Sequence, residues 1–325
     1  MFVWLTAGLG LIILLLAGDA LVRGAVNLSL RVGIPALIVS LTIVAFGTSA
    51  PELLIAISAI DEHAPGLALG NVVGSNTANI LLVLGIPALL SRLHTSTCDT
   101  RKNYLMMMGA TLLFIALAFT GRFTWVSGIV LLSVLALILG DAFRVARQHR
   151  RSRGAEPTAE TCASSDDLEE VEGSDPDMPW WRIIVFLVLG LLGLPLGADL
   201  LVDSAVDIAR QFHVRETVIG LTLVAVGTSL PELATTVMAA LRRQADVALG
   251  NVIGSNMFNL LAIIGIATFV GPIPVDRSFL QFDLWVMLLA SLLLVPFVFM
   301  KMDITRRWGM ILAGLYGVYI LSILS

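Results

Sequence analysis

The chain carries the sequence GTSAPE at residues 47–52 and GTSLPE at residues 227–232, 180 positions later. Both copies lie in strongly apolar sequence, and both place a glutamate directly after a proline. A carboxylate at membrane depth is costly and is usually functional. Because proline interrupts a helix, the two copies predict an ion site shared between two broken helices.

The composition predicts an integral membrane protein. Of the 325 residues, 57% are hydrophobic and 14% are charged, and the mean hydropathy is +0.92, which is far too apolar for a soluble globular protein. A membrane-spanning helix needs about 20 apolar residues. The polar interruptions divide the chain into ten such segments, at residues 2–22, 33–60, 66–90, 103–120, 124–143, 181–202, 214–241, 246–270, 282–300 and 307–324.

The basic residues predict the orientation of these spans. With the N-terminus outside, 16 of the 20 Lys and Arg residues lie in cytoplasmic loops and 4 lie outside. Positively charged loops favour the cytoplasmic side, so we expect both termini outside. We expect a multi-pass monomer in the plasma membrane, the inner membrane of a bacterium. Nothing in the charge pattern resembles a nucleic-acid-binding surface.

Residues 144–180 separate two apolar halves. This stretch begins basic, becomes rich in Ser, Ala and Glu, turns acidic, and ends before a Trp pair that suits a membrane interface. We interpret it as a disordered cytoplasmic linker, with a regulatory segment as the alternative. Cys98 and Cys162 fall on the predicted cytoplasmic side, where disulfides are rare, and no metal-ligand spacing joins them.

The two halves are copies of one unit. Residues 41–85 align with residues 221–265 without a gap, and 22 of the 45 positions are identical. Each half has five predicted spans, an odd number, so the copies must lie in opposite orientations. The expected fold is therefore an all-α polytopic membrane protein, with one five-helix repeat at residues 1–143 and its inverted copy at residues 181–325.

The motif chemistry predicts a site built from oxygen ligands. Pro51 lacks an N–H, so the carbonyl of Gly47 loses its helical partner, and Pro231 does the same to Gly227. The following segments, ALGNVVGSN at 68–76 and ALGNVIGSN at 248–256, add amide and hydroxyl oxygens. Such ligands suit hard cations such as calcium and sodium. The motif regions contain no His or Cys, which disfavours a soft transition metal.

These motifs resemble those of the cation/calcium exchanger superfamily, and most closely those of its bacterial and archaeal sodium/calcium exchangers. The resemblance extends over nearly the whole chain. It implies that Glu52 and Glu232 are the central calcium ligands, with the backbone carbonyls of Thr48 and Thr228 beside them. It also implicates, in sodium or shared cation sites, Ser49, Ser229, Ser75, Ser255, Asn79, Asn259 and the carbonyls of Ala45 and Ala225.

Two positions bear on the subtype. Potassium-dependent relatives carry Asp where this chain has Asn259, which disfavours potassium cotransport. Proton/calcium exchangers typically carry Glu where this chain has Gly74 and Gly254. Proton coupling stays open as an alternative, because Glu52 or Glu232 could bind protons as buried acids. The resemblance thus implies a potassium-independent, electrogenic sodium/calcium antiporter that works by alternating access without a cofactor.

Other functions receive less support from the sequence. An intramembrane hydrolase could use Ser49 or Ser229 as a nucleophile, but no His or Lys is placed near either serine as a base. A passive channel is disfavoured by broken helices at a repeat interface.

Three further groups have structural as well as functional interpretations. We expect Gly70, Gly74, Gly250 and Gly254 to be close-packing positions. The residues Asn71, Asn76, Asn251 and Asn256 could either join helices or bind cations. For Asp19 and Asp199, which also match at the 180-residue offset, we expect a structural role.

Overall fold

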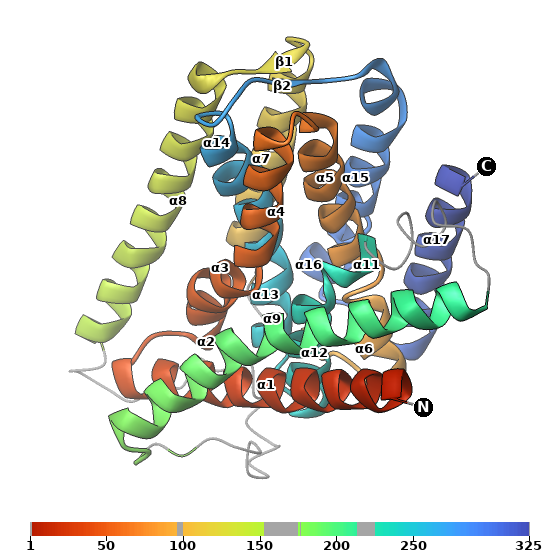
Figure 1. Cartoon of the computed structure of the whole chain (residues 1–325). Helices are drawn as coiled ribbons and strands as arrows, with labels where there is room; N and C mark the ends of the chain where they lie inside the picture. The colour runs from red at the N-terminus through yellow and green to blue at the C-terminus, as the bar shows by residue number, and fades with distance from the viewer. Residues whose placement is uncertain (1, 96–99, 153–174, 176, 213–224, 325) are drawn as a thin grey trace.

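The computed structural model describes residues 2–95, 100–152, 175, 177–212 and 225–324. This part of the chain is helical apart from one two-stranded sheet (Figure 1). The elements, in which η marks a π-helix, are α1 (Phe2–Val32), α2 (Ala36–Val39), η1 (Ser40–Val44), α3 (Ala45–Thr48), α4 (Ala50–Asp61), α5 (Pro65–Leu81), α6 (Gly85–Leu90), α7 (Arg101–Ala118), β1 (Arg122–Phe123), α8 (Trp125–Ser152), α9 (Trp180–Gln211), α11 (Ala225–Gly227), α12 (Leu230–Leu241), α13 (Ala245–Met257), η4 (Phe258–Ile263), α14 (Ile264–Ala267), β2 (Ile273–Pro274), η5 (Phe279–Asp283), α15 (Leu284–Leu292), α16 (Val295–Phe299) and α17 (Arg306–Leu324).

Seven helical stretches in the described residues are long and apolar enough to cross a bilayer. They are Val3–Val32, Ala36–Asp61, Pro65–Leu90, Trp125–Gln148, Trp180–Gln211, Ala245–Ala267 and Phe279–Phe299. The other three predicted spans coincide with the shorter or less apolar helices α7, α12 and α17. Residues 214–224 of the predicted seventh span lie outside the described residues. The structure thus confirms a polytopic helical protein, and the count of ten spans stays a prediction.

The long helices α1 and α9 lie against each other across one end of the bundle, at a steep angle to upright helices such as α8 (Figure 1). Glycines allow this contact, since a Cβ added at Gly190 would lie 2.5 Å from the Cβ of Leu21. The predicted span ends at 22 and 202 are too early, because both helices continue for about ten residues. A helix longer than the bilayer is thick can span it by tilting.

Both proline motifs interrupt a helix at the same place. Between α3 and α4, Ser49 has φ −88° and ψ 2°, and between α11 and α12, Ser229 has φ −90° and ψ 5°. Pro51 and Pro231 stand in the first turn of the following helix, where a missing N–H leaves no hydrogen bond unmade. The predicted discontinuous helices are therefore confirmed.

The helices after the motifs form the centre of the molecule. Every residue of α13 is buried, and α5 is buried along most of its length. At one end of the bundle β1 pairs antiparallel with β2, with Phe123 opposite Ile273. Elsewhere, Leu93 and Ile304 form an isolated bridge. Helix α8 extends into the first residues of the predicted linker, while 153–174 and 176 lie outside the described residues.

Candidate functional site

The two motif glutamates are completely buried. Glu52 and Glu232 have 0% exposed surface, and each lies in the first turn of the helix that follows a break, α4 or α12. The N-terminus of a helix carries partial positive charge, which favours a carboxylate there. No ion pair found among the described residues includes either glutamate. Both acids thus lie in the interior without a basic partner among the described residues.

The side chain of Glu232 receives hydrogen bonds from both repeats. Its Oε1 accepts from the Ser49 hydroxyl at 3.3 Å and from the Ser255 hydroxyl at 3.5 Å. The Asn251 amide donates to the Glu232 backbone carbonyl at 3.3 Å and to the Thr236 hydroxyl at 3.1 Å. The motif of the first repeat therefore contacts the carboxylate of the second.

Two hydroxyl pairs show that the half-sites are related by the repeat. The hydroxyls of Thr48 and Ser255 lie 3.4 Å apart, and those of Ser75 and Thr228 also lie 3.4 Å apart. Adding 180 to Thr48 and subtracting 180 from Ser255 turns the first pair into the second. Each motif thus meets the helix that follows the other motif.

Asparagines join the helices α5 and α13 near the same place. The Asn79 amide donates to the Asn256 side-chain oxygen at 3.1 Å, and the Asn256 amide donates to the backbone carbonyl of Asn76 at 3.4 Å. Asn256 therefore has the helix-joining role that was one of its two interpretations. Asn79 keeps its own side-chain oxygen without a hydrogen-bond partner in the described chain.

The buried polar atoms that lack a partner gather around these motifs. In the part of the chain that the structure describes, the atoms without a hydrogen bond are Glu52 Oε1 and Oε2, Asn71 Nδ2, Asn76 Oδ1, Asn79 Oδ1, Ser229 Oγ, Glu232 Oε2, Asn259 Nδ2 and Oδ1, and Arg23 Nε, which forms an ion pair with Asp19 instead. All except the Arg23 atom belong to the two motifs or to the helices that follow them. A buried polar atom without a partner is costly, and a cation would satisfy the oxygens of this set.

The half-site around Glu52 contains most of these unpaired atoms. Glu232 accepts a bond from Ser49, whereas the equivalent pair, Glu52 and Ser229, is not hydrogen bonded. Similarly, the Asn251 side-chain amide donates hydrogen bonds, whereas the amide of its counterpart Asn71 has no acceptor in the described chain. One half-site therefore satisfies more of its own polar groups, and the other leaves them available to a ligand.

A cavity of about 680 Å³ reaches the half-site around Glu52. Its lining includes Asn71, Ser75 and Thr228 together with other residues of α5, η5 and α17. Asp283 and Tyr319 also line it, and the Tyr319 hydroxyl donates to the Asp283 carboxylate at 3.4 Å. The cavity thus extends to the hydroxyls of Ser75 and Thr228, with a lining that is largely apolar.

The four motif glycines divide into two kinds. A Cβ at Gly250 would lie 2.9 Å from the Leu37 carbonyl oxygen, and one at Gly254 would lie 2.5 Å from that of Leu41, so the close-packing prediction is confirmed for both. It is wrong for Gly70 and Gly74. A Cβ at Gly70 would meet its nearest atom at 3.7 Å, and one at Gly74 would meet nothing within 4 Å, because both glycines line the cavity.

The structure brings most of the predicted site residues together. Hydrogen bonds connect Thr48, Ser49, Glu232 and Ser255 in one group and Ser75 with Thr228 in another. Asn259 is completely buried with both side-chain atoms unpaired in the described chain. The carbonyl of Ala45 accepts from the Ser49 N–H at 3.1 Å and the Thr48 hydroxyl at 3.3 Å, and Ala225 begins α11.

One residue of the site has no counterpart in the motifs. Thr236 lies four residues after Glu232, on the same helix face, and holds Asn251 through its hydroxyl, whereas the first repeat has Ala56 at this position. The i, i+4 spacing from Glu232 is the signal that could have identified it. Comparison of the two repeats did not identify Thr236, because the first repeat has alanine at the equivalent position.

Comparison with known proteins gives the same picture. The profile of the family described as sodium/calcium exchanger protein matches residues 2–142 and 182–324. The putative antiporter CaxA of Alkalimonas amylolytica is 37% identical, with 88% of this chain and 86% of that protein covered. The sodium/calcium exchanger MaX1 of Methanosarcina acetivorans is 32% identical, with 96% of this chain and 95% of that protein covered.

Solved structures extend the likeness to three dimensions. The sodium-calcium exchanger NCX_Mj, soaked with 2.5 mM Na⁺ and 0.1 mM Ca²⁺, superimposes with a TM-score of 0.79 at 30% sequence identity. The match covers 99% of this chain and 98% of that one. The family profile over both halves of the chain and the whole fold thus agree, and the protein belongs to the sodium/calcium exchangers, a family of membrane transporters.

Proposed function

We propose that this protein exchanges sodium for calcium across the membrane by alternating access, at the site formed by Glu52 and Glu232. The observation that carries this proposal is the set of unpaired, buried oxygens around the two glutamates. Two carboxylates balance the charge of one calcium ion. Calcium prefers about 6–8 oxygen ligands from carboxylates and carbonyls, which is the chemistry that the site offers.

The proposed cation ligands are those predicted from the sequence. Glu52 and Glu232 would bind calcium together with the carbonyls of Thr48 and Thr228. The residues Ser49, Ser229, Ser75, Ser255, Asn79 and Asn259 and the carbonyls of Ala45 and Ala225 would bind sodium or contribute to shared sites. The closeness of these hydroxyls to Glu232 and to one another supports this assignment, because ions sharing ligands must compete.

The proposed architecture is ten spans in two inverted repeats, residues 1–143 and 181–325, joined by a cytoplasmic linker at 144–180. The hydroxyl pairs Thr48–Ser255 and Ser75–Thr228 support it, because a two-fold relation between repeats would produce both. The loop pairings support it as well. Leu93 and Ile273 differ by 180 positions. Leu93 pairs with Ile304 in the loop after span nine, and Ile273 pairs with Phe123 in the loop after span four.

Alternating access would follow from a difference between the two repeats. Helix α13 packs closely against α2 and η1 at Gly250 and Gly254. The equivalent glycines of α5, Gly70 and Gly74, line the open cavity instead. With both termini outside, the residues at the mouth of this cavity lie toward the outer surface. In the proposed orientation this arrangement would be the outward-accessible state, and exchange of the two packing arrangements would expose the site to the cytoplasm.

The coupling is proposed to be electrogenic, with several sodium ions for one calcium ion, and independent of potassium. Asn259 supports potassium independence, because it leaves the site with two carboxylates rather than three. Proton coupling is the alternative that the buried glutamates keep open. We further propose a monomer in the bacterial inner membrane with both termini outside.

Counterflow in proteoliposomes tests the proposed function. Vesicles loaded with sodium and diluted into sodium-free buffer should accumulate labelled calcium, and vesicles with equal sodium on both sides should not. Uptake that ignored the sodium gradient and followed an imposed pH gradient would replace sodium by protons as the coupling ion. Absence of uptake under either gradient would overturn the proposed exchange.

A further inference from the structure

An ion-pair cluster joins α1 to the far end of α12. Arg23 Nε lies 2.9 Å from Asp19 Oδ2, and the guanidinium of Arg242 contacts the other carboxylate oxygen, Asp19 Oδ1, through Nε and Nη2. The side chains of Arg242 and Asp19 are only 11% and 19% exposed. A charged contact that is this shielded from water costs free energy to break, so it restrains the two helices.

This cluster is attached to α12, the helix that carries the candidate cation ligand Glu232. Arg242 follows the last residue of α12, and Glu232 lies in the first turn of that helix, about 15 Å away along the axis. Next to Asp19, Gly18 brings α1 against α12, since an added Cβ would lie 3.0 Å from the Ala234 carbonyl oxygen. Any displacement of α1 relative to α12 must therefore break or stretch the contact between Asp19 and Arg242.

The residues equivalent to this cluster in the other repeat cannot form the same ion pairs. At the 180-residue offset, Asp19 corresponds to Asp199, Arg23 to Asp203 and Arg242 to Glu62. All three counterparts are acidic. Asp199 and Asp203 are exposed, lie four residues apart on one face of α9, and have no ion pair in the described chain. Like charges cannot form the contact that holds Asp19.

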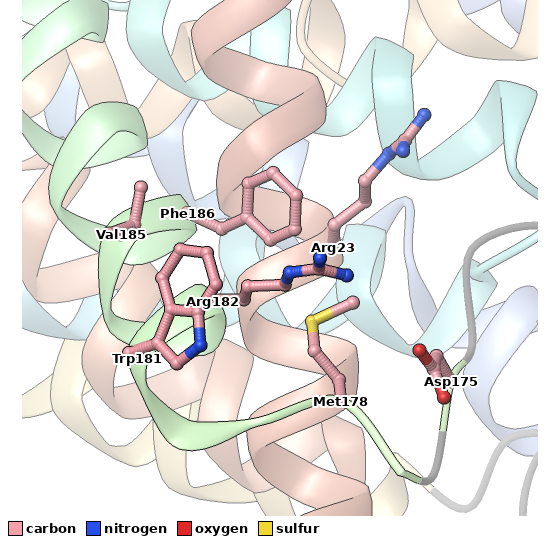
Figure 2. Close-up of a pocket in the computed structure, with 7 residues that line it drawn as sticks. All are labelled: Arg23, Asp175, Met178, Trp181, Arg182, Val185 and Phe186. Carbon is pink, nitrogen blue, oxygen red and sulfur yellow. The ribbon is translucent and has the colours of Figure 1, made fainter.

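The surroundings of Arg23 allow water to reach the cluster when it opens. Arg23 lines a cavity of about 450 Å³ between α1 and the start of α9, together with Arg182 and Asp175 (Figure 2). The Asp175 backbone N–H donates to the Asn27 side-chain oxygen at 2.8 Å, and the Arg182 guanidinium lies 5.3 Å from the Trp181 ring centroid. Separated charges would therefore be hydrated from this side, which lowers the cost of opening.

We propose that Asp19 and Arg242 are positioning residues that form an ionic lock, which holds α1 on α12 while the cytoplasmic side of the site is closed and breaks in each transport cycle. This inference rests on the proposed alternating access. The lock stabilises the outward-accessible state alone, because the three equivalent residues, Asp199, Asp203 and Glu62, are all acidic and cannot form such an ion pair. Loss of the lock shifts the protein toward the inward-accessible state without changing a cation ligand.

Distance measurements on spin-labelled protein test the lock. Labels at Leu5 on α1 and Leu241 on α12 sit on side chains that are 64% and 49% exposed, after Cys98 and Cys162 are replaced by Ser. Without ligand ions, Asp19→Asn and Arg242→Gln should each raise the ratio of a second distance population to the first about tenfold, equivalent to about 1.4 kcal/mol. The double variant should shift less than the sum of the two single variants, since both changes remove the contact between Asp19 and Arg242.

Asp199→Asn is the matched control, because it removes the counterpart acid at the equivalent position. It should leave the distances unchanged, and Arg242→Lys should restore most of the parent distribution even if Arg242→Gln folds poorly. Equal shifts in Asp19→Asn and Asp199→Asn, or no shift in either, would overturn the lock.

Transport by the same proteins separates the two proposals. A distance shift in Asp19→Asn, in a protein whose parent shows no sodium-driven calcium uptake, would retain the lock and reject the exchange function. Sodium-driven calcium uptake by the parent protein, together with unshifted distances in the variants, would retain the exchange function and reject the lock. If both hold, Asp19→Asn should change the apparent KM for calcium oppositely on the two sides of the membrane, which a purely structural role would not do.

Discussion

At the scale of single residues, the two glutamates form a site whose charge is compensated by nothing in the described protein. Neither has a basic partner, and three of their four carboxylate oxygens lack a hydrogen bond. We predict that Glu52→Gln and Glu232→Gln each abolish sodium-driven calcium uptake, because one remaining charge cannot balance a divalent ion. Radiolabelled calcium uptake into proteoliposomes measures this.

Asp199→Asn provides the matched comparison, since it also neutralises a carboxylate but on an exposed part of α9. It should retain uptake close to that of the parent protein. Parent-like uptake by either glutamine variant would remove that glutamate from the site, provided that the variant is inserted in equal amount.

Asn259 offers a prediction about ion selectivity. Its side chain is fully buried among the unpaired groups of the site, so Asn259→Asp would add a third negative charge that a further monovalent ion could neutralise. We expect calcium uptake by the parent to be unchanged when potassium is replaced by choline, and uptake by Asn259→Asp to depend on potassium. A potassium requirement in the parent protein would contradict the proposed coupling.

At the scale of helices, local sequence predicts interruptions better than lengths. Pro51 and Pro231 correctly located both breaks, because proline acts on its own turn. The sequence did not predict where α1 and α9 end, because the two helices pack against each other and this tertiary contact supports their extra turns. Likewise, the repeat alignment treats Gly74 and Gly254 as equal, although only the tertiary contacts decide which of them is enclosed.

These two glycines allow a matched test of the packing difference between α5 and α13. A Cβ at Gly254 would lie 2.6 Å from the Cβ of Ala45, whereas one at Gly74 would meet nothing within 4 Å. We expect Gly254→Ala to lose about 1–3 kcal/mol of stability through overpacking. Gly74→Ala should keep or raise stability, because alanine favours the helix by about 1 kcal/mol. Thermal unfolding in detergent, followed by fluorescence, compares them, and equal Tm values would contradict the asymmetry.

At the scale of the whole molecule, the repeat predicts which residues meet but not how their environments differ. The offset of 180 correctly anticipated that the two motif regions meet, as the Thr48–Ser255 and Ser75–Thr228 pairs demonstrate. It could not reveal that Glu232 accepts hydrogen bonds while Glu52 does not. An alignment describes symmetry, whereas alternating access requires two equivalent halves to adopt different conformations at one time.

The coupling of the whole exchanger can be measured through its response to voltage. If three or more sodium ions leave for each calcium ion that enters, uptake moves positive charge outward, so an inside-positive potential should accelerate it. One net charge crossing 60 mV corresponds to about 1.4 kcal/mol, or about tenfold in the calcium ratio reached at equilibrium. Valinomycin with high external potassium imposes this potential on sodium-loaded proteoliposomes, and omitting valinomycin provides the control. Calcium accumulation that is insensitive to the potential would indicate an electroneutral exchange of two sodium ions for one calcium ion.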